Sequence, residues 1–207
     1  MSEYALIIFV RNYEEKHLNK NLVQAVGVER AVEVYRGIGL DIKEIAESLR
    51  LNRFVYYSGS VPAQDETWDN VLYDRNTRSG ESFAEAAADA FRDVFKQGFE
   101  KVVLVSDDAA ELTPSSVDQA FEALDEVDVV VGPVKNGSVY ALGLDQHDPE
   151  LFESLAAKEG PLFEALIDTM IERRMIWHEL PILSSPETPE DLDLLRIRKL
   201  QREVLSH

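Results

Sequence analysis

Apolar residues in this chain follow two alternating patterns along its length. Short apolar runs of the length of a buried strand, rich in valine, isoleucine and aromatic residues, lie at 4–10, 53–58, 101–105 and 127–131. Stretches with apolar side chains three and four positions apart, which predict amphipathic helices, lie at 27–50, 82–98 and 113–124. The alternation predicts an α/β protein, a three-layer α/β/α sandwich around a mainly parallel sheet.

The remaining predicted elements are shorter. A strand at 138–144 is expected to return antiparallel after Asn136-Gly137, a good turn pair. Further expected elements are a short strand near 71–73, helices at 149–155 and 160–174, a strand at 176–180 and a final helix from Thr188 to the basic residues 196–202. At 207 residues, one domain spanning 1–207 is the default expectation.

Acidic residues dominate the charge of the chain. There are 39 Asp and Glu residues against 21 Lys and Arg residues, a formal net charge of -18. Such a field repels nucleic acid and anionic membranes, so neither is an expected partner. The acidity either serves solubility or fits a host with high internal salt. In such a host the Debye length, over which charges are screened, shortens to about 3 Å at 1 M salt.

Cysteine is absent, which excludes disulfides, a thiolate nucleophile and cysteine-ligated zinc. The four histidines show no close ligand spacing. The first residues lack the pattern of a signal peptide, and no run of about 18 apolar residues occurs. We therefore expect a soluble, cytoplasmic protein.

Two predicted strands end in polar loops that carry candidate chemistry. Asp107 and Asp108 follow the strand at 101–105, and Asn136 lies in the loop after 127–131. Ligands of open α/β sheets bind at the carboxyl ends of the strands, where an aspartate pair suits a divalent cation. Aspartates also form turns and cap helices, so a structural role stays open for each loop.

These loops, with Phe9 near the start and Thr188-Pro189-Glu190-Asp191-Leu192 near the end, resemble a glycosyltransferase-like family of the nucleotide-diphospho-sugar transferase superfamily. The family is of the DUF2064 type and is related to the guanylyltransferases of molybdenum cofactor and of phospholactate. The resemblance runs from about Tyr4 to Leu195 with the motifs in the same order. It implies a GT-A-like fold and a nucleotide or nucleotide-sugar donor.

The resemblance also implies roles for individual residues. Asp108 corresponds to a catalytic aspartate that coordinates Mg²⁺ or Mn²⁺ on the diphosphate, and Asp107 and Glu187 are further candidate metal ligands. Asn136 stands at a second catalytic position, where the family carries aspartate. Residues that would contact the nucleotide are Arg11, Lys16, Lys20, Gly80, Gly132 and Gly137.

Framework positions match the family, whereas several polar positions differ from it. Lys16 replaces a glycine of the phosphate-binding loop, and Glu14 and Glu15 add negative charge there. Two functions therefore stay open. One is a metal-dependent transferase that moves a glycosyl or nucleotidyl group to a small-molecule acceptor, and the other is a catalytically inactive homologue with a binding or regulatory role. A homodimer is compatible with either.

Overall fold

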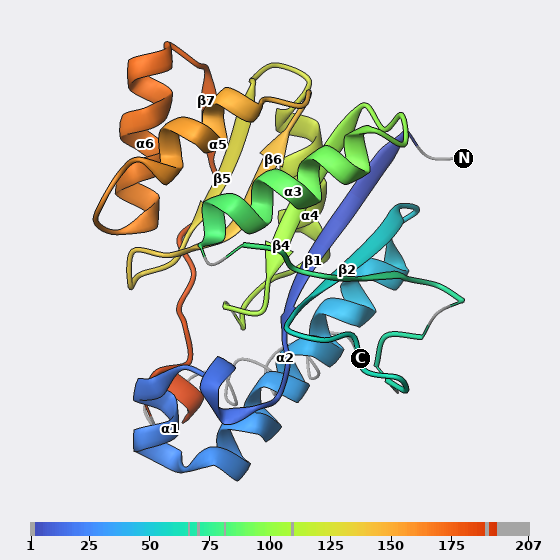
Figure 1. Ribbon diagram of the computed structural model, residues 1–207, viewed down its shortest axis with the longest axis vertical. Helices are drawn as coiled ribbons and strands as arrows, with labels where there is room; N and C mark the ends of the chain where they lie inside the picture. The colour runs from blue at the N-terminus through green and yellow to red at the C-terminus, as the bar shows by residue number, and fades with distance from the viewer. Residues whose placement is uncertain are drawn as a thin grey trace.

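The computed structural model describes residues 3–65, 67–69, 71–80, 82–108, 110–188 and 191–193. A seven-stranded sheet with the order β3-β2-β1-β4-β6-β5-β7 forms its centre (Figure 1). The strands are β1 (Tyr4–Arg11), β2 (Asn52–Ser58), β3 (Asp74–Thr77), β4 (Lys101–Ser106), β5 (Val129–Pro133), β6 (Val139–Leu144) and β7 (Trp177–Glu179). Strand β6 runs antiparallel to β4 and β5, as predicted, and the other pairs are parallel.

Helices cover both faces of this sheet. They are α1 (Lys20–Val26), α2 (Val28–Ser48), α3 (Phe83–Phe95), α4 (Pro114–Ala123), α5 (Pro149–Ala156) and α6 (Leu162–Arg173), with a short 3₁₀ helix, η1 (Glu15–His17), before α1. One buried cluster packs α2 and α4 on one face, and a second packs α3, α5 and α6 on the other (Figure 1). The predicted three-layer α/β/α sandwich is confirmed.

Local sequence accounts for the boundaries of several helices. Ser82 and Glu85 form a capping box at the start of α3, so two backbone donors of its first turn are satisfied. Thr113 caps α4, with Pro114 at the first helical position. The Asn19 side chain accepts hydrogen bonds from two backbone amides and starts α1.

The strand expected near 71–73 is wrong. Val71 is 91% exposed and lies in a turn, and β3 begins only at Asp74. The Asp69 carboxylate accepts hydrogen bonds from the backbone amides of Val71 at 2.8 Å and Leu72 at 3.0 Å. Because this side chain satisfies the amides locally, the segment turns instead of pairing with the sheet.

The predicted final helix is only partly described. Residues 191–193 are helical, the Thr188 hydroxyl accepts a hydrogen bond from Asp191 N at 3.2 Å, and the other residues of the predicted helix lie outside the described residues. None of the helices in the described ranges has the length and apolar character that crossing a bilayer requires.

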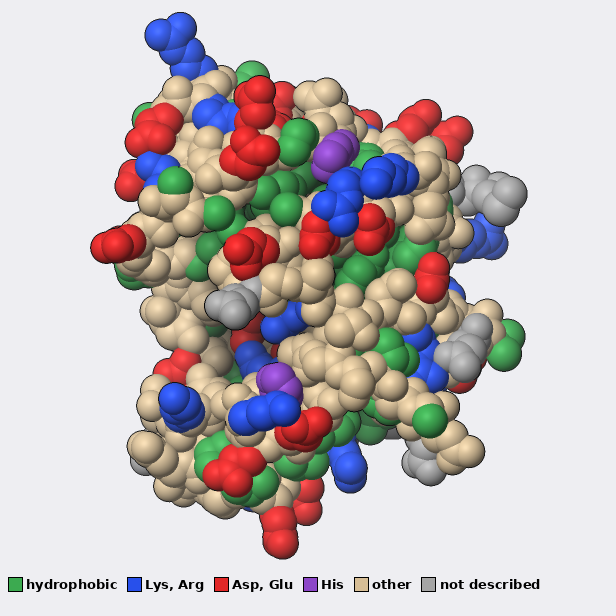
Figure 2. Space-filling model, viewed as in Figure 1, with side chains coloured by type: hydrophobic (Ala, Val, Ile, Leu, Met, Phe, Trp, Pro, Cys, Tyr) green, Lys and Arg blue, Asp and Glu red, His purple; other side chains and the backbone are tan. Residues whose placement is uncertain are grey.

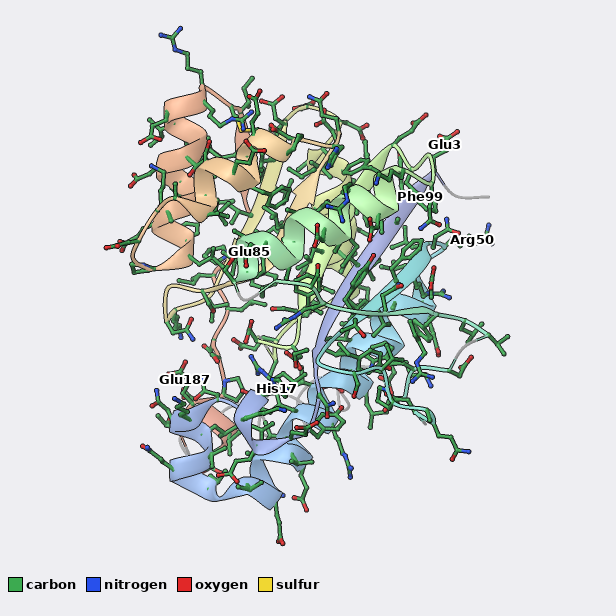
Figure 3. The ribbon with its side chains drawn as sticks, viewed as in Figure 1. Glu3, His17, Arg50, Glu85, Phe99 and Glu187 are labelled. Carbon is green, nitrogen blue, oxygen red and sulfur yellow. The ribbon has the colours of Figure 1, made fainter. Side chains whose placement is uncertain are left out.

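Parallel strands bring distant loops to one edge of the sheet. Glu3, Arg50 and Phe99, which precede β1, β2 and β4, lie near one end of the sheet, and His17 and Glu187 lie toward the opposite end (Figure 3). This opposite end is the carboxyl edge of the parallel strands, and the segment after β7 descends to α1 there (Figure 1). The carboxyl edge of the sheet therefore carries the loops in which the sequence predicted functional residues.

Candidate functional site

One arginine at the end of β1 pairs with both aspartates that follow β4. The backbone N–H of Arg11 donates to Asp107 Oδ2 at 2.9 Å, and its guanidinium Nη2 donates to Asp108 Oδ1. The Arg11 Nη1 atom lies 3.7 Å from Asp107 Oδ1. These contacts form because β1 and β4 are adjacent, with Phe9 opposite Ser106 in the register.

Burial of this ion cluster is uneven, because the side chains of Asp107 and Arg11 are 8% and 16% exposed and that of Asp108 is 31% exposed. As a whole residue Asp107 is 5% exposed, and burial raises its pKa although Arg11 acts in the opposite direction. Burial alone would lower the pKa of Arg11, but the two aspartates outweigh it and the net shift is upward. The Arg11 guanidinium also lies 4.2 Å from the centre of the Tyr35 ring on α2, a cation–π contact.

A serine orients the second aspartate. The Ser106 hydroxyl donates to Asp108 Oδ2 at 3.1 Å, while the other oxygen of Asp108 faces Arg11. Both oxygens of this carboxylate are therefore engaged, and its orientation is set by β1 and β4 together.

A second arginine lies close enough to the same aspartates to interact with them electrostatically. Arg78 follows β3, and its guanidinium lies 5.0 Å from the centre of the Phe9 ring. Burial lowers the pKa of Arg78, and Asp107 and Asp108 act in the opposite direction. None of the described residues accepts a side-chain hydrogen bond from Arg78.

The structure brings Lys16 and Lys20 together. Both are exposed in the α1 region and line an open groove of about 570 Å³, and Lys16 Nζ lies 2.8 Å from a carboxylate oxygen of Glu14. None of their described contacts involves Arg11 or the aspartate pair. Figure 2 shows Lys, Arg and acidic side chains near the hollow that crosses this face of the molecule.

Glu187 and Asn136 form a separate pair. Asn136 Nδ2 donates to Glu187 Oε1 at 2.6 Å, and Asn21 Nδ2 donates to Glu187 Oε2 at 3.5 Å. Over the part of the chain that the structure describes, no three His, Asp or Glu side chains group closely enough to hold a metal ion. Glu187 therefore does not join Asp107 and Asp108, and the predicted ligand set stays a prediction.

The glycines predicted to contact nucleotide have structural reasons for their identity. Gly80 has φ +78°, and a Cβ there would lie 2.4 Å from the Cβ of Glu85. A Cβ at Gly132 would lie 2.6 Å from the Tyr140 ring. Gly137, in the turn between β5 and β6, has φ +85°, and a Cβ there would lie 2.9 Å from the Cβ of Pro161. Contact with a nucleotide stays a prediction for all three.

Sequence reasoning did not single out Arg78 or a nearby cavity of about 720 Å³. The cavity lies beside the carboxyl ends of β1 and β2, and its lining includes Arg11, Tyr13, Arg36, Tyr57 and Trp68. These residues come from strand ends, loops and α2, so no local pattern connects them. Of the lining residues, the resemblance pointed to Arg11, and Asp65 lies in a turn-rich loop.

The protein-family model described as "Uncharacterized protein conserved in bacteria (DUF2064)" matches residues 41–157, more than half of the chain. The chain belongs to the DUF2064 family. The match includes the two aspartates after β4 and the turn between β5 and β6. No match was found among curated proteins.

Solved structures share the fold of this DUF2064 protein. A protein described as a nucleotide-diphospho-sugar transferase, from Desulfovibrio desulfuricans G20, has a TM-score of 0.80 at 23% identity, covering 91% of this chain and 84% of that chain. A CMP:2-keto-3-deoxy-manno-octonic acid synthetase complexed with CTP has a TM-score of 0.60 at 12% identity, covering 97% and 100%. Rv0371C from Mycobacterium tuberculosis H37Rv, in complex with manganese, has a TM-score of 0.55 at 13% identity, covering 93% and 97%. At these identities the likeness establishes the fold, which is that of nucleotide-diphospho-sugar transferases.

Proposed function

We propose that this DUF2064 protein is a transferase that binds a nucleotide or nucleotide-sugar donor at the carboxyl edge of β1 and β4. It would move a glycosyl or nucleotidyl group to a small-molecule acceptor. The observation that carries the proposal is the cluster of Arg11 and Arg78 against Asp107 and Asp108, at the edge where α/β sheets bind ligands. The CTP complex of a protein with the same fold supports a donor of this class.

The arginines supply what an anionic donor requires. A protein with a formal net charge of -18 repels phosphates unless positive charge is concentrated locally. Guanidinium groups bind phosphate oxygens through paired N–H donors and stabilise charge on a leaving diphosphate. Arg78 would contact the phosphates directly, because none of the described residues accepts a side-chain hydrogen bond from it, and Lys16 and Lys20 would add positive charge on the α1 side.

The metal-dependent form of this proposal assigns Mg²⁺ or Mn²⁺ to Asp107, Asp108 and Glu187. The residues do not fit a preformed cation site. Arg11 already pairs with both aspartates, and amides of Asn21 and Asn136 bind Glu187. No step of the proposed transfer is therefore assigned to a metal.

A second candidate is a nucleotide-binding protein without transferase activity. Asn136 favours it, because a side-chain amide does not ionise or accept a proton at neutral pH. Both ends of this amide are also engaged, since Oδ1 accepts from Ser138 N at 3.0 Å while Nδ2 donates to Glu187. Asn136 thus acts as a turn residue in this structure. The catalytic role that the resemblance implies would require its side chain to adopt other contacts in the ligand-bound protein.

Thermal unfolding against a panel of nucleotides and nucleotide sugars tests the proposal. A ligand that binds only the folded protein raises the midpoint. We expect a shift with one base class that is lost in Arg78→Ala and retained in Arg30→Ala, an exposed arginine paired with Glu33 on α2. Phosphorus NMR of the stabilising donor with candidate acceptors then separates transfer from binding. A folded protein that no member of the panel stabilises would contradict the proposal.

A further inference from the structure

We propose that Arg11 is a built-in cation that takes the role of the divalent metal at this site, so that the site binds the anionic group of its ligand without a metal ion. The identity of the ligand rests on the proposed function. The metal independence rests on the geometry of Arg11 and the two aspartates, which is a separate observation.

Arg11 lies where a cation shared by the aspartates would lie. Its Nη2 donates to Asp108 Oδ1, and its Nη1 lies 3.7 Å from Asp107 Oδ1, so one guanidinium bridges the two carboxylates. A divalent ion bound by the same pair would compete for these oxygens. The remaining Asp108 oxygen accepts from Ser106, which leaves neither oxygen of that carboxylate without a partner.

The Arg11 side chain is also fixed in this position. It is 16% exposed, its guanidinium packs on the Tyr35 ring, and its own backbone N–H is bonded to Asp107. Displacing it would leave a largely buried guanidinium without its partners, which is costly. A metal ion would bind only if its coordination by the aspartates released more free energy than the displacement of Arg11 requires.

Charge balance leads to the same conclusion. Arg11 pairs with the two aspartates and Arg78 acts on both electrostatically, so these four side chains are formally neutral without an added ion. The Arg11 Nη1 atom is buried and has no hydrogen-bond acceptor among the described residues. A buried donor without an acceptor is unfavourable, and an oxygen of a phosphate ligand would satisfy it. Arg78 provides further donors for the same group.

The first experiment measures Mn²⁺ binding to the full chain without nucleotide, from the electron paramagnetic resonance signal of free Mn²⁺. We expect no specific site in the wild-type protein. We expect a site in Arg11→Met, which keeps an apolar stem against Tyr35 but frees both carboxylates, and its loss in Arg11→Met/Asp108→Asn. Arg30→Ala is the matched control and should resemble wild type. Stoichiometric Mn²⁺ binding by wild type that Asp108→Asn removes would overturn the inference.

Arg11→Met leaves two carboxylates without their cation and therefore loses stability. Its thermal midpoint provides a second readout, because Mn²⁺ should raise it while leaving wild type and Arg30→Ala unchanged. A midpoint of wild type that rises with Mn²⁺, and no longer rises in Asp108→Asn, would count against Arg11 as the resident cation even if Arg11→Met does not fold.

The second experiment measures the affinity of the stabilising nucleotide for wild-type protein by calorimetry, in EDTA and in Mg²⁺. Equal affinities within about twofold support the inference, and a gain of about tenfold or more with Mg²⁺ overturns it. Absence of nucleotide binding in both conditions would refute the proposed function instead. The Mn²⁺ experiments would then decide the role of Arg11 by themselves.

Discussion

The side-chain amide of Asn136 donates to the Glu187 carboxylate at 2.6 Å, which ties the turn between β5 and β6 to the segment that descends from β7. That segment also contacts α1, because Asn21 Nδ2 donates to Glu187 Oε2 at 3.5 Å. The pair therefore links three parts of the chain at the carboxyl rim of the sheet.

We expect Glu187→Ala to loosen this rim with little effect on global stability, because exposed polar contacts contribute less than about 1 kcal/mol. Hydrogen exchange of the amides at 136–138 and 183–188 should become faster in Glu187→Ala. Glu187→Gln keeps an acceptor for Asn136 and serves as the matched control. Protection that is unchanged in Glu187→Ala would show that the contact does not hold the segment.

Gly80→Ala should destabilise the protein by about 2 kcal/mol or more. Gly80 combines φ +78° with a Cβ position 2.4 Å from the Cβ of Glu85, so strain and collision add. Gly98→Ala is a matched control, because Gly98 has φ +90° and no atom within 4 Å of its Cβ position. Strain alone should cost that control about 1 kcal/mol. Urea denaturation measures both, and equal losses would contradict the collision.

Asp65 organises the loop beside the larger cavity. Its carboxylate accepts from the Tyr57 hydroxyl at 2.8 Å, from Thr67 N at 2.8 Å and from Trp68 N at 3.1 Å. Removing one of these bonds with Tyr57→Phe should cost about 1 kcal/mol, and Asp65→Ala should cost more because it removes all three. Chemical denaturation measures the difference. A loss in Tyr57→Phe that equals or exceeds the loss in Asp65→Ala would contradict this arrangement.

We expect Asp145, after β6, to lower the stability of the folded protein in a pH-dependent way. Its Oδ1 atom is buried without a hydrogen-bond partner among the described residues, and burial, together with Asp128, raises its pKa. A pKa that is higher in the folded state means that stability is lost as pH rises through it. Asp145→Asn should therefore be more stable than wild type at neutral pH, by less than about 1 kcal/mol.

The advantage of Asp145→Asn should vanish in acid, below the unfolded-state pKa of about 4, where the wild-type carboxyl is neutral in both states. Urea denaturation at neutral and at acidic pH measures it. Asp118→Asn, on the exposed face of α4, is the matched control for replacing a carboxylate with an amide. If Asp145→Asn remains more stable than wild type by the same amount in acid, its stability gain comes from packing and not from the charge of Asp145.

Patterns within short segments predicted most of the framework. The apolar run of β1 is buried along its interior positions, and the helical spacing at 27–50 is α2. The failure near Val71 came from a single local competitor, the Asp69 side chain, which satisfied backbone amides that a strand would have paired.

The sequence by itself determined the α/β alternation, the antiparallel return at β6, the helix caps and the polar loops at the strand ends. These depend on contacts within a few residues and on burial along one element. Only the tertiary structure decided what those loops do together. Arg11 and Asp108 lie 97 positions apart and meet because β1 and β4 are neighbours in the sheet. Glu187, which the sequence grouped with the aspartates, pairs with Asn136 instead, because the segment after β7 runs past the turn between β5 and β6.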